Sequence, residues 1–420
     1  MCIRDRYCRA AEAGQRVYDA KADAIGYYRR ALALLGDSPR EDPAKAALIW
    51  EKLGDVLHLT AQYGPAREAY QDALVRSVAT DGVARADLQR KLGNTWREER
   101  AYAMAHQAYD AGLRLLGEPP TQQDGRAGAG EHRWWQAWLD LQLEIVQTHY
   151  WVGESELAVE RMDDMRTRVE RYATAIQRVH FFMQYATLLW QHARFAPTPQ
   201  TIAYLHEAQG AVAESPEAQQ TPSIIFRLGF LLLWHDMLAE AEAKILAALA
   251  SAERSIDLTL EVRCLIYLGV VYRRQNRPDH VRACAARALE LAAAANMPEY
   301  VATVRANLAW LAWRAGDLAA VDLHARAALA LWAELAPGHP STPYQWTALW
   351  PLLAVDLDRG AIDQALAWAR NMLLPAQQRL PAVLADPLAC AVRAQDAADL
   401  PTARQWLRQA LDAAVTKHYL

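Results

Sequence analysis

The sequence is short of the residues that build turns, collagen-like repeats and disordered chains. Glycine and proline occur 19 times each in 420 residues, about 9% together, against about 12% in an average protein. Alanine, the strongest helix former, makes up about one residue in five. With a hydrophobic fraction of 53%, this composition excludes collagen-like, disordered and β-sandwich folds and predicts an all-α protein.

Cysteine is also scarce, and its spacing indicates neither a disulfide framework nor a zinc site. The five cysteines are Cys2, Cys8, Cys264, Cys284 and Cys390, and none forms a Cys-x-x-Cys pair. A reducing compartment is the simplest fit to this usage. We therefore expect a cytoplasmic protein without a metal site.

Neither an excess of positive charge nor a long apolar run is present. The formal net charge is −4, which leaves no surplus of Lys and Arg to hold a phosphate backbone. The most apolar stretch, residues 224–238, contains Arg227, His235 and Asp236, so it falls short of the ~18 uncharged residues that span a bilayer. We expect no nucleic-acid contact by this region and no membrane partner.

Catalytic motifs are missing as well. No G-x-x-x-x-G-K-[ST] loop occurs, and His206-Glu207 lacks the second histidine of a zinc-protease helix. Asp163 and Asp164 are neighbours on an expected helix, where their carboxylates splay apart rather than converge on a substrate. The sequence predicts no catalytic residue, no cofactor and no enzyme activity for this chain.

What the sequence does contain is a repeat. In residues 50–74, Leu53-Gly54 is followed twelve positions after the glycine by Ala66, and then by Tyr70 and Ala73. The pattern resembles the tetratricopeptide repeat (TPR), a pair of antiparallel helices. Gly54 and the alanines provide close approach between the two helices, and Tyr70 fills the gap between them.

The same frame recurs along the chain. The good copies begin at Leu92-Gly93, Leu228-Gly229 and Leu268-Gly269, each with the glycine twelve positions before its first second-helix residue: Ala105, Ala241 and Val281. Weaker copies begin at Leu308-Ala309 and Leu352-Leu353. A period near 40 residues and an opening half-copy around Tyr28 predict a TPR-like right-handed α-α superhelix of about nine helix pairs plus a leading half.

Four segments follow from this reading. Residues 1–6, MCIRDR, have the appearance of a translated sequencing adaptor, and we expect them to be non-native. Residues 7–117 hold the N-terminal TPR units. Residues 118–131, rich in Pro, Gly and Gln, form a flexible loop. Residues 132–420 hold C-terminal TPR-like units that continue the same solenoid.

The first helix of each TPR pair lines a groove, and counting from each Leu-Gly places aromatic and arginine side chains there. The predicted partner-binding residues are Phe226, Phe230, Trp234, Arg273, Arg274, Trp310, Trp313, Arg314 and Trp350. Aromatic and Arg side chains are the usual anchors of protein interfaces. The alternative is that these tryptophans are core residues of long helices. In the N-terminal half, Arg90, Asn94 and Arg97 occupy similar positions and suit a carboxylate.

Several stretches of the second half go beyond a generic repeat. They include residues 262–274 (VRCLIYLGVVYRR), 305–317 (RANLAWLAWRAGD) and 344–355 (YQWTALWPLLAV). The chain resembles the C-terminal TPR region of large bacterial AAA/STAND-type ATPase signalling proteins, which often carry an N-terminal class III adenylate/guanylate cyclase domain. No ATPase or cyclase residue is present to transfer to this chain.

The resemblance implies a non-catalytic interaction or sensor module, the regulatory part of a bacterial signal-transduction ATPase or cyclase. Its partner would be a protein or peptide, or an upstream ATPase/cyclase domain of the same chain. The alternative is the inducer-binding TPR arm of a large transcriptional activator.

Overall fold

The computed structural model describes residues 21–36, 43–119, 128–255, 257–294, 297–335 and 342–420. Within these ranges there are twenty α-helices, one short 3-10 helix and no strand, so the predicted all-α, TPR-like fold is confirmed. Residues 1–6 and residues 120–127 of the expected loop lie outside the described residues.

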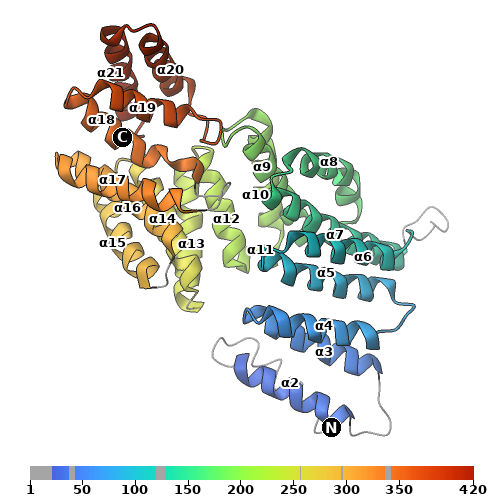
Figure 1. Ribbon diagram of the computed structural model, residues 1–420. Coiled ribbons are helices and arrows are strands. Elements are labelled where there is room, and N and C mark those ends of the chain that lie inside the picture. Colours follow the sequence, from blue (N-terminus) through green and yellow to red (C-terminus); the bar gives the residue numbers. More distant parts are fainter. Residues whose placement is uncertain (1–20, 37–42, 120–127, 256, 295–296, 336–341) are drawn as a thin grey trace. The chain divides into compact units, whose positions relative to one another are not determined.

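The chain divides into two compact units, Met1–Phe181 and Phe182–Leu420. The helices of unit 1 are α2 (Lys21–Gly36), α3 (Pro43–Leu59), α4 (Tyr63–Arg76), α5 (Gly82–Glu98), α6 (Tyr102–Leu116), α7 (Ala129–Val152) and α8 (Ser155–Tyr172) (Figure 1). Helix α9 (Ala175–His192) contains the division between the units.

Unit 2 continues with α10 (Pro199–Glu214), α11 (Pro216–Gln220), α12 (Pro222–Trp234), α13 (Leu238–Ser255), α14 (Leu258–Arg274), α15 (Pro278–Ala294), α16 (Pro298–Arg314) and α17 (Leu318–Ala333). After the 3-10 turn Thr342–Tyr344 come α18 (Trp346–Asp358), α19 (Ile362–Leu373), α20 (Ala382–Asp396) and α21 (Leu400–Thr416).

Consecutive helices pack as pairs. The pairs are α3 with α4, α5 with α6 and α7 with α8 in unit 1, and α12 with α13, α14 with α15, α16 with α17, α18 with α19 and α20 with α21 in unit 2. Helices α9 and α10 meet through Tyr185 and Tyr204, whose ring centroids are 4.2 Å apart. Nine pairs after a leading α2 agree with the number expected from the repeat.

First helices also pack against one another. In unit 2, α14 contacts both α12 and α16, and α16 contacts α18; in unit 1, α5 contacts α7. Side chains on the first helices of neighbouring pairs therefore come together, which is what positions the sites described below.

At Gly54 and Gly93 the glycine of the Leu-Gly pair allows the close helix crossing. A methyl group at Gly54 would stand 2.5 Å from a ring carbon of Tyr70, and one at Gly93 would stand 2.2 Å from a ring carbon of Tyr109. Both tyrosine rings are buried in the pair. The spacing of sixteen residues between glycine and ring thus matches a real contact, as the sequence pattern predicts.

The turns inside the pairs are also alike. In each, a residue in the left-handed region precedes a backbone N–H that bonds to the carbonyl five residues earlier, which closes the helix as in a Schellman motif. These bonds are Gln62 to Leu57, Ala101 to Trp96, Glu154 to His149, Phe195 to Trp190, Met237 to Leu232, Arg277 to Tyr272, Asp317 to Ala312, Ala361 to Asp356 and Asp399 to Ala394.

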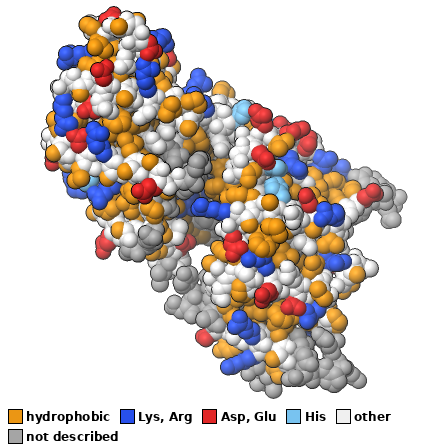
Figure 2. Space-filling model, in the orientation of Figure 1, with side chains coloured by type: hydrophobic (Ala, Val, Ile, Leu, Met, Phe, Trp, Pro, Cys, Tyr) orange, Lys and Arg blue, Asp and Glu red, His pale blue; other side chains and the backbone are white. Residues whose placement is uncertain are grey.

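The pairs bury alanine, leucine and tryptophan between them, and the surface is mixed. Trp190, Trp310, Trp332, Trp346 and Trp350 are among the largest fully buried side chains. The face seen in Figure 2 carries acidic and basic side chains interspersed with apolar ones. No described helix has the length and apolarity needed to cross a bilayer.

The close crossing gives a first testable prediction. Gly93→Ala forces the buried Tyr109 ring to move, and overpacking of this kind costs about 1–3 kcal/mol; we expect a lower midpoint in thermal unfolding followed by circular dichroism. Gly26→Ala, on α2 with nothing within 4 Å of the added methyl, is the matched control and should stabilise slightly. Equal effects of the two substitutions would contradict the role of Gly93.

Candidate interaction site

The structure places the predicted partner-binding residues in three environments. Phe226, Trp234, Arg273, Trp310 and Trp350 are buried; Phe230, Arg274 and Trp313 are half-buried; and Arg314 is exposed. The five buried side chains are core residues of unit 2, the alternative that the sequence left open for its tryptophans. Contact of any of the nine with a partner stays a prediction.

Arg273 is the most unusual of the nine, because it is a fully buried cation. Its guanidinium lies 5.3 Å from the ring centroid of Trp346 and 5.7 Å from that of Trp310. It donates hydrogen bonds to the carbonyls of Thr347 (2.8 Å) and Tyr419 (2.6 Å). Burial, followed by the charge of Arg274, lowers the pKa of Arg273 to about 9.

The neighbouring arginines are also engaged by this chain. The Arg274 guanidinium lies 4.1 Å from the ring centroid of Tyr419 and bonds to Asp236 at 3.0 Å. Arg314 donates to Asn276 at 2.7 Å and lies 5.1 Å from the ring of Trp310. Tyr419 is buried and contacts both Arg273 and Arg274, so these two predicted site residues are engaged by a distant part of the same chain.

Aromatic side chains of the predicted site lie close to Tyr344, a residue distant from them in sequence. Tyr344 stacks on Trp234, with centroids 4.1 Å apart and planes 8° apart, and it also meets Trp190 and Phe195. Phe230 packs edge-on to Trp190 and Trp234. Sequence reasoning missed Trp190 and Tyr344, because neither lies in a Leu-Gly frame that would place it opposite α12.

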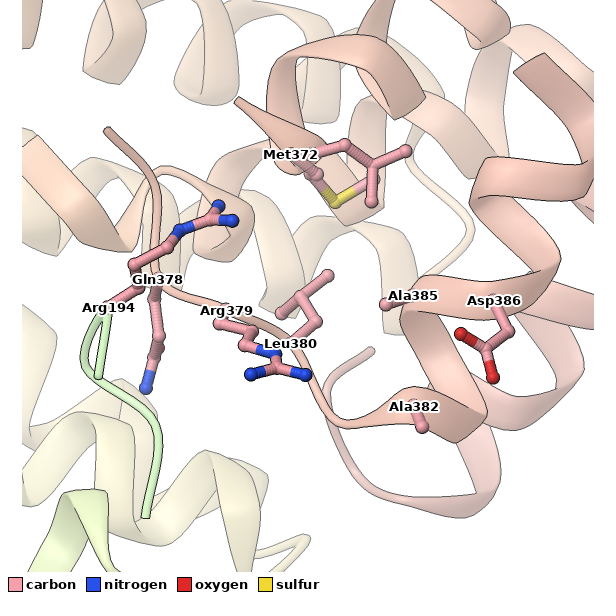
Figure 3. Close-up of a pocket in the computed structure, with 9 residues that line it drawn as sticks. Arg194, Met372, Gln378, Arg379, Leu380, Ala382, Ala385 and Asp386 are labelled. Carbon is pink, nitrogen blue, oxygen red and sulfur yellow. The ribbon is translucent and has the colours of Figure 1, made fainter. Parts of the chain in front are cut away.

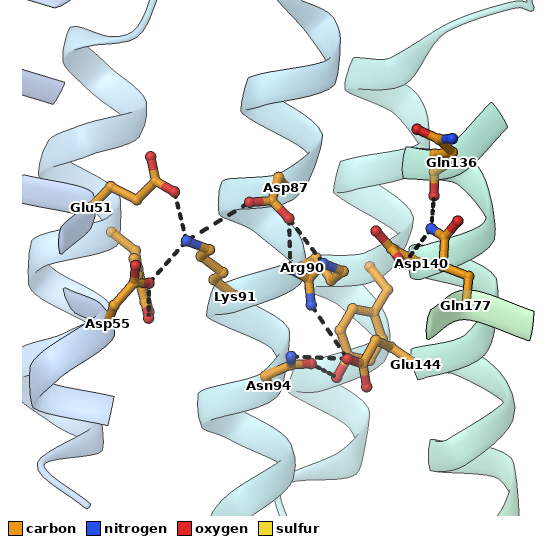
Figure 4. Close-up of polar contacts among 12 residues, drawn as sticks. Glu51, Asp55, Asp87, Arg90, Lys91, Asn94, Gln136, Asp140, Glu144 and Gln177 are labelled. Carbon is orange, nitrogen blue, oxygen red and sulfur yellow. Dashed lines mark hydrogen bonds and ion pairs between the residues drawn. The ribbon is translucent and has the colours of Figure 1, made fainter. Parts of the chain in front are cut away.

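Unit 1 differs, since charged groups line its first helices. The three residues suited to a carboxylate, Arg90, Asn94 and Arg97 on α5, all bind Glu144 of α7. Figure 4 shows Arg90 and Asn94 directed at Glu144. Asn94 donates at 3.0 Å and in turn accepts a hydrogen bond from the Tyr109 hydroxyl at 2.8 Å. The carboxylate that these residues receive in the structure thus belongs to the same chain.

The charges of Glu144 and its partners determine its titration. Burial alone raises the pKa of the Glu144 carboxyl, but Arg97, Arg90 and the amide of Asn94 outweigh burial, and the net pKa lies below the ordinary value. The ionised form is therefore the stable one in the folded protein.

A second group of charges lies beside the first. Lys91 of α5 donates to Glu51 at 2.6 Å and to Asp55 at 2.9 Å, both on α3. Arg90 holds Asp87 at 2.7 Å. Together with the Glu144 cluster, these pairs form a continuous charged row across α3, α5 and α7 (Figure 4).

Asp140 closes the row on α7. Its carboxylate accepts a hydrogen bond of 2.7 Å from Gln177 of α9. Burial raises the pKa of Asp140, and Arg90 and Gln177 only partly oppose this effect. A second cation near Asp140 would lower the pKa of this carboxyl, because an added positive charge favours its ionised form.

The row borders an open groove of about 360 Å³ between α3, α5 and α7. Its polar lining is Glu51, Asp87, Arg90, Arg133, Gln136 and Asp140. Among the described residues no group of three His, Cys, Asp or Glu side chains is placed to hold a metal ion. The arrangement suits binding of a charged segment by hydrogen bonds and ion pairs.

No family model matches the chain, and no curated protein matches its sequence. Among solved structures, a Rap protein complexed with Competence and Sporulation Factor has a TM-score of 0.48 at 12% identity, covering 99% of this chain and 98% of its own. NprR in complex with its cognate peptide NprX has a TM-score of 0.48 at 11% identity, covering 77% of this chain and 98% of its own.

A signal transduction ATPase with numerous domains (STAND) protein with a tetratricopeptide repeat sensor, from Pyrococcus horikoshii, has a TM-score of 0.45 at 11% identity. That match covers 84% of this chain and 54% of the other. At this level of similarity the three likenesses concern the helical fold and say nothing of the site residues.

The Glu144 cluster predicts a specific pH dependence. Because the folded pKa of Glu144 is depressed, its contribution to stability is complete above the ordinary value of 4.5 and is lost as the pH falls through the folded pKa. Glu144→Gln should lower the free energy of unfolding by about 1–3 kcal/mol near neutral pH. Between pH 7 and pH 3, the melting temperature of this variant should fall less steeply than that of the wild type. As a control, Glu160→Gln, at an exposed position on α8, should show the same pH dependence of melting temperature as the wild type.

The burial of the aromatic residues predicts a contrast between two neighbours on α16. Trp310 is 1% exposed, so Trp310→Ala should cost about 3–5 kcal/mol. Trp313 is only half-buried, and Trp313→Ala should leave the circular-dichroism melt close to that of the wild type. A large loss from Trp313→Ala would make this residue part of the core and remove it from the predicted interface.

Proposed function

We propose that this chain is a non-catalytic protein-interaction and sensor module whose charged groove in unit 1 binds an extended segment of a partner. The observation that carries the proposal is the row of ionised side chains on three successive first helices, beside an open groove. Ionised side chains are poor core formers, and the ion pair between Arg90 and Asp87, whose carboxylate stays 37% exposed, adds little to stability. Recognition of a partner explains their alignment better than packing does.

The balance of charge favours a basic segment. The row contains five carboxylates, Glu51, Asp55, Asp87, Asp140 and Glu144, and three cations, Arg90, Lys91 and Arg97. A lysine or arginine of the partner would pair with the carboxylates of Asp87 and Asp140, which line the open groove. Complementary charge of this kind sets the specificity and the association rate of an interface.

The ion pairs in the row are also exchangeable. The side chains of Glu51, Asp87 and Lys91 remain 26%, 37% and 17% exposed. Asp87 is the most exposed of the three, so its ion pairs are the most strongly screened and an incoming cation replaces them at the smallest cost. This property suits reversible binding by a sensor.

For the parent protein, the resemblance of the second half supports a regulatory TPR region at the C-terminal side of a bacterial signal-transduction ATPase or cyclase. Binding would act by favouring one arrangement of the helix pairs over another, through different affinity for the two. The second candidate is the inducer-binding arm of a large transcriptional activator. The gene sequence upstream distinguishes them: P-loop and cyclase motifs favour the first, and a DNA-binding domain without a cyclase favours the second.

The groove proposal is tested with defined peptides. We expect a fluorescein-labelled alternating Lys-Ala octapeptide to bind, measured by fluorescence anisotropy at low salt, and the Glu-Ala peptide to bind at least tenfold more weakly. The double variant Asp87→Asn with Asp140→Asn should weaken Lys-Ala binding about tenfold, since each lost ion pair contributes up to ~1 kcal/mol.

The charge-matched control is Glu160→Gln with Asp164→Asn on the exposed side of α8, which should keep the wild-type affinity. Equal binding of the two peptides, or equal loss in both double variants, would refute the groove as the site. Turnover of ATP or GTP by the purified chain would refute the non-catalytic assignment.

A further inference from the structure

Another cavity lies in unit 2, where two segments distant in sequence meet. The stretch between α19 and α20, residues 374–381, lies against Arg194 and Phe195, the turn between α9 and α10. The N–H of Arg379 donates to the carbonyl of Arg194 at 2.8 Å, and the Arg194 guanidinium donates to the carbonyl of Leu374 at 2.8 Å. We call these contacts the seam of unit 2.

Gln378 is the centre of the seam. Its side chain donates to the carbonyl of Phe195 at 2.8 Å and accepts from the indole of Trp346 at 2.8 Å. Its backbone N–H donates to the carbonyl of Pro343 at 3.0 Å. On the other side, Arg194 and Phe195 both have positive φ, 54° and 58°, a backbone conformation that non-glycine residues rarely hold without support from their surroundings.

A cavity of about 210 Å³ opens at this seam. Arg194, Gln378 and Arg379 line one side, and Ala382, Ala385 and Asp386 of α20 line the other (Figure 3). Met372 and Leu380 provide apolar surface. The volume is below the ~300–1,000 Å³ of pockets for drug-sized ligands, so the occupant is a smaller molecule.

The two outer charges of this cavity are opposite in sign and face different parts of it. Figure 3 shows the Arg379 guanidinium and the Asp386 carboxylate apart from each other, with Ala382 and Ala385 between them. Neither side chain makes an ion pair with a described residue. Arg194 also lines the cavity, and its Nε is buried and lacks a hydrogen-bond acceptor among the described residues.

We propose that this cavity binds a small zwitterion, with its anionic end on Arg379, its ammonium on Asp386 and a short apolar body over Leu380 and Ala385. Guanidinium with carboxylate and carboxylate with ammonium are charge-assisted pairs, which are stronger than neutral hydrogen bonds. A ligand with only one charge leaves the opposite end of the cavity unmatched.

Because the cavity lies at the seam, a bound ligand would also affect the stability of the seam. The ligand would rest on residues 379–380 and on α20 together, and so would stabilise the seam against opening, because a ligand of the closed form shifts the equilibrium toward it. This effector site is separate from the charged groove of unit 1 and does not depend on it.

The test uses zwitterions of graded length: glycine, γ-aminobutyrate, 5-aminopentanoate and glycyl-leucine. Pentanoate and 5-aminopentanamide are the half-charged analogues. By isothermal titration calorimetry on the full chain, we expect at least one zwitterion to bind at least tenfold more tightly than both half-charged analogues. In hydrogen exchange, the amides of Gln378 and Arg379 should become more protected with that ligand present.

Arg379→Gln and Asp386→Asn should each weaken binding of that zwitterion about tenfold, to the level of the half-charged compounds. Both side chains are exposed, so both variants should fold, which a circular-dichroism melt checks. Arg408→Gln, on the exposed side of α21, is the matched control. Absence of binding by all four zwitterions, equal binding of pentanoate, or unchanged affinity in both variants would overturn the proposal.

Discussion

Everything else in the fold depends on how closely two helices of a pair can cross. At Gly54 and Gly93 a tyrosine ring of the second helix occupies the space that a side chain on the first helix would fill. The contact fixes the register of the pair, because a shift by one residue would bring the ring against Leu53 or Leu92 instead. Once the register is fixed, the remaining faces of each first helix are presented to the first helices of neighbouring pairs.

The two units share the same helix-pair architecture but differ in the side chains between neighbouring first helices. In unit 1 the facing positions carry Asp87, Arg90 and Glu144, which leave water-accessible ion pairs and an open groove. In unit 2 they carry Trp234, Trp310 and Arg273, which are buried. At Gly269 the second-helix residue is the small Ala285. The space is taken by Asn307 of the next first helix, whose amide nitrogen would stand 3.0 Å from a methyl group added at Gly269.

Local spacing predicted the fold because each pair is specified within about 40 residues. The same spacing placed Arg90, Asn94 and Arg97 together as a receptor for a carboxylate, and the structure puts Glu144 there. The identity of that carboxylate was beyond sequence reasoning. Its partner residues on α5 are about fifty positions away, and their approach depends on the angle between pairs, which no local periodicity encodes.

The tryptophans show the same limit more clearly. Counting from the repeat frame assigned Trp234 and Trp310 to a groove but did not say what fills it. Tyr344, which stacks on Trp234, and Tyr419, which accepts a hydrogen bond from Arg273, reach these positions only because unit 2 brings distant segments together. The sequence thus predicts which residues lie on one face of a first helix, whereas the residues that contact that face are determined by the tertiary structure.

Arg273 illustrates how the two units differ in the burial of their charged side chains. Moving a guanidinium out of water is costly, and here only the carbonyls of Thr347 and Tyr419 and two indole rings compensate. Opening this site would leave the cation without those acceptors until water reached it, so an incoming partner must replace several contacts at once. The side chains of the charged row in unit 1 keep part of their surface exposed, so an incoming charge meets their ion pairs without first opening a core. The proposed reversible recognition therefore fits the row, and the ligand proposed for unit 2 fits an existing opening, the cavity at the seam.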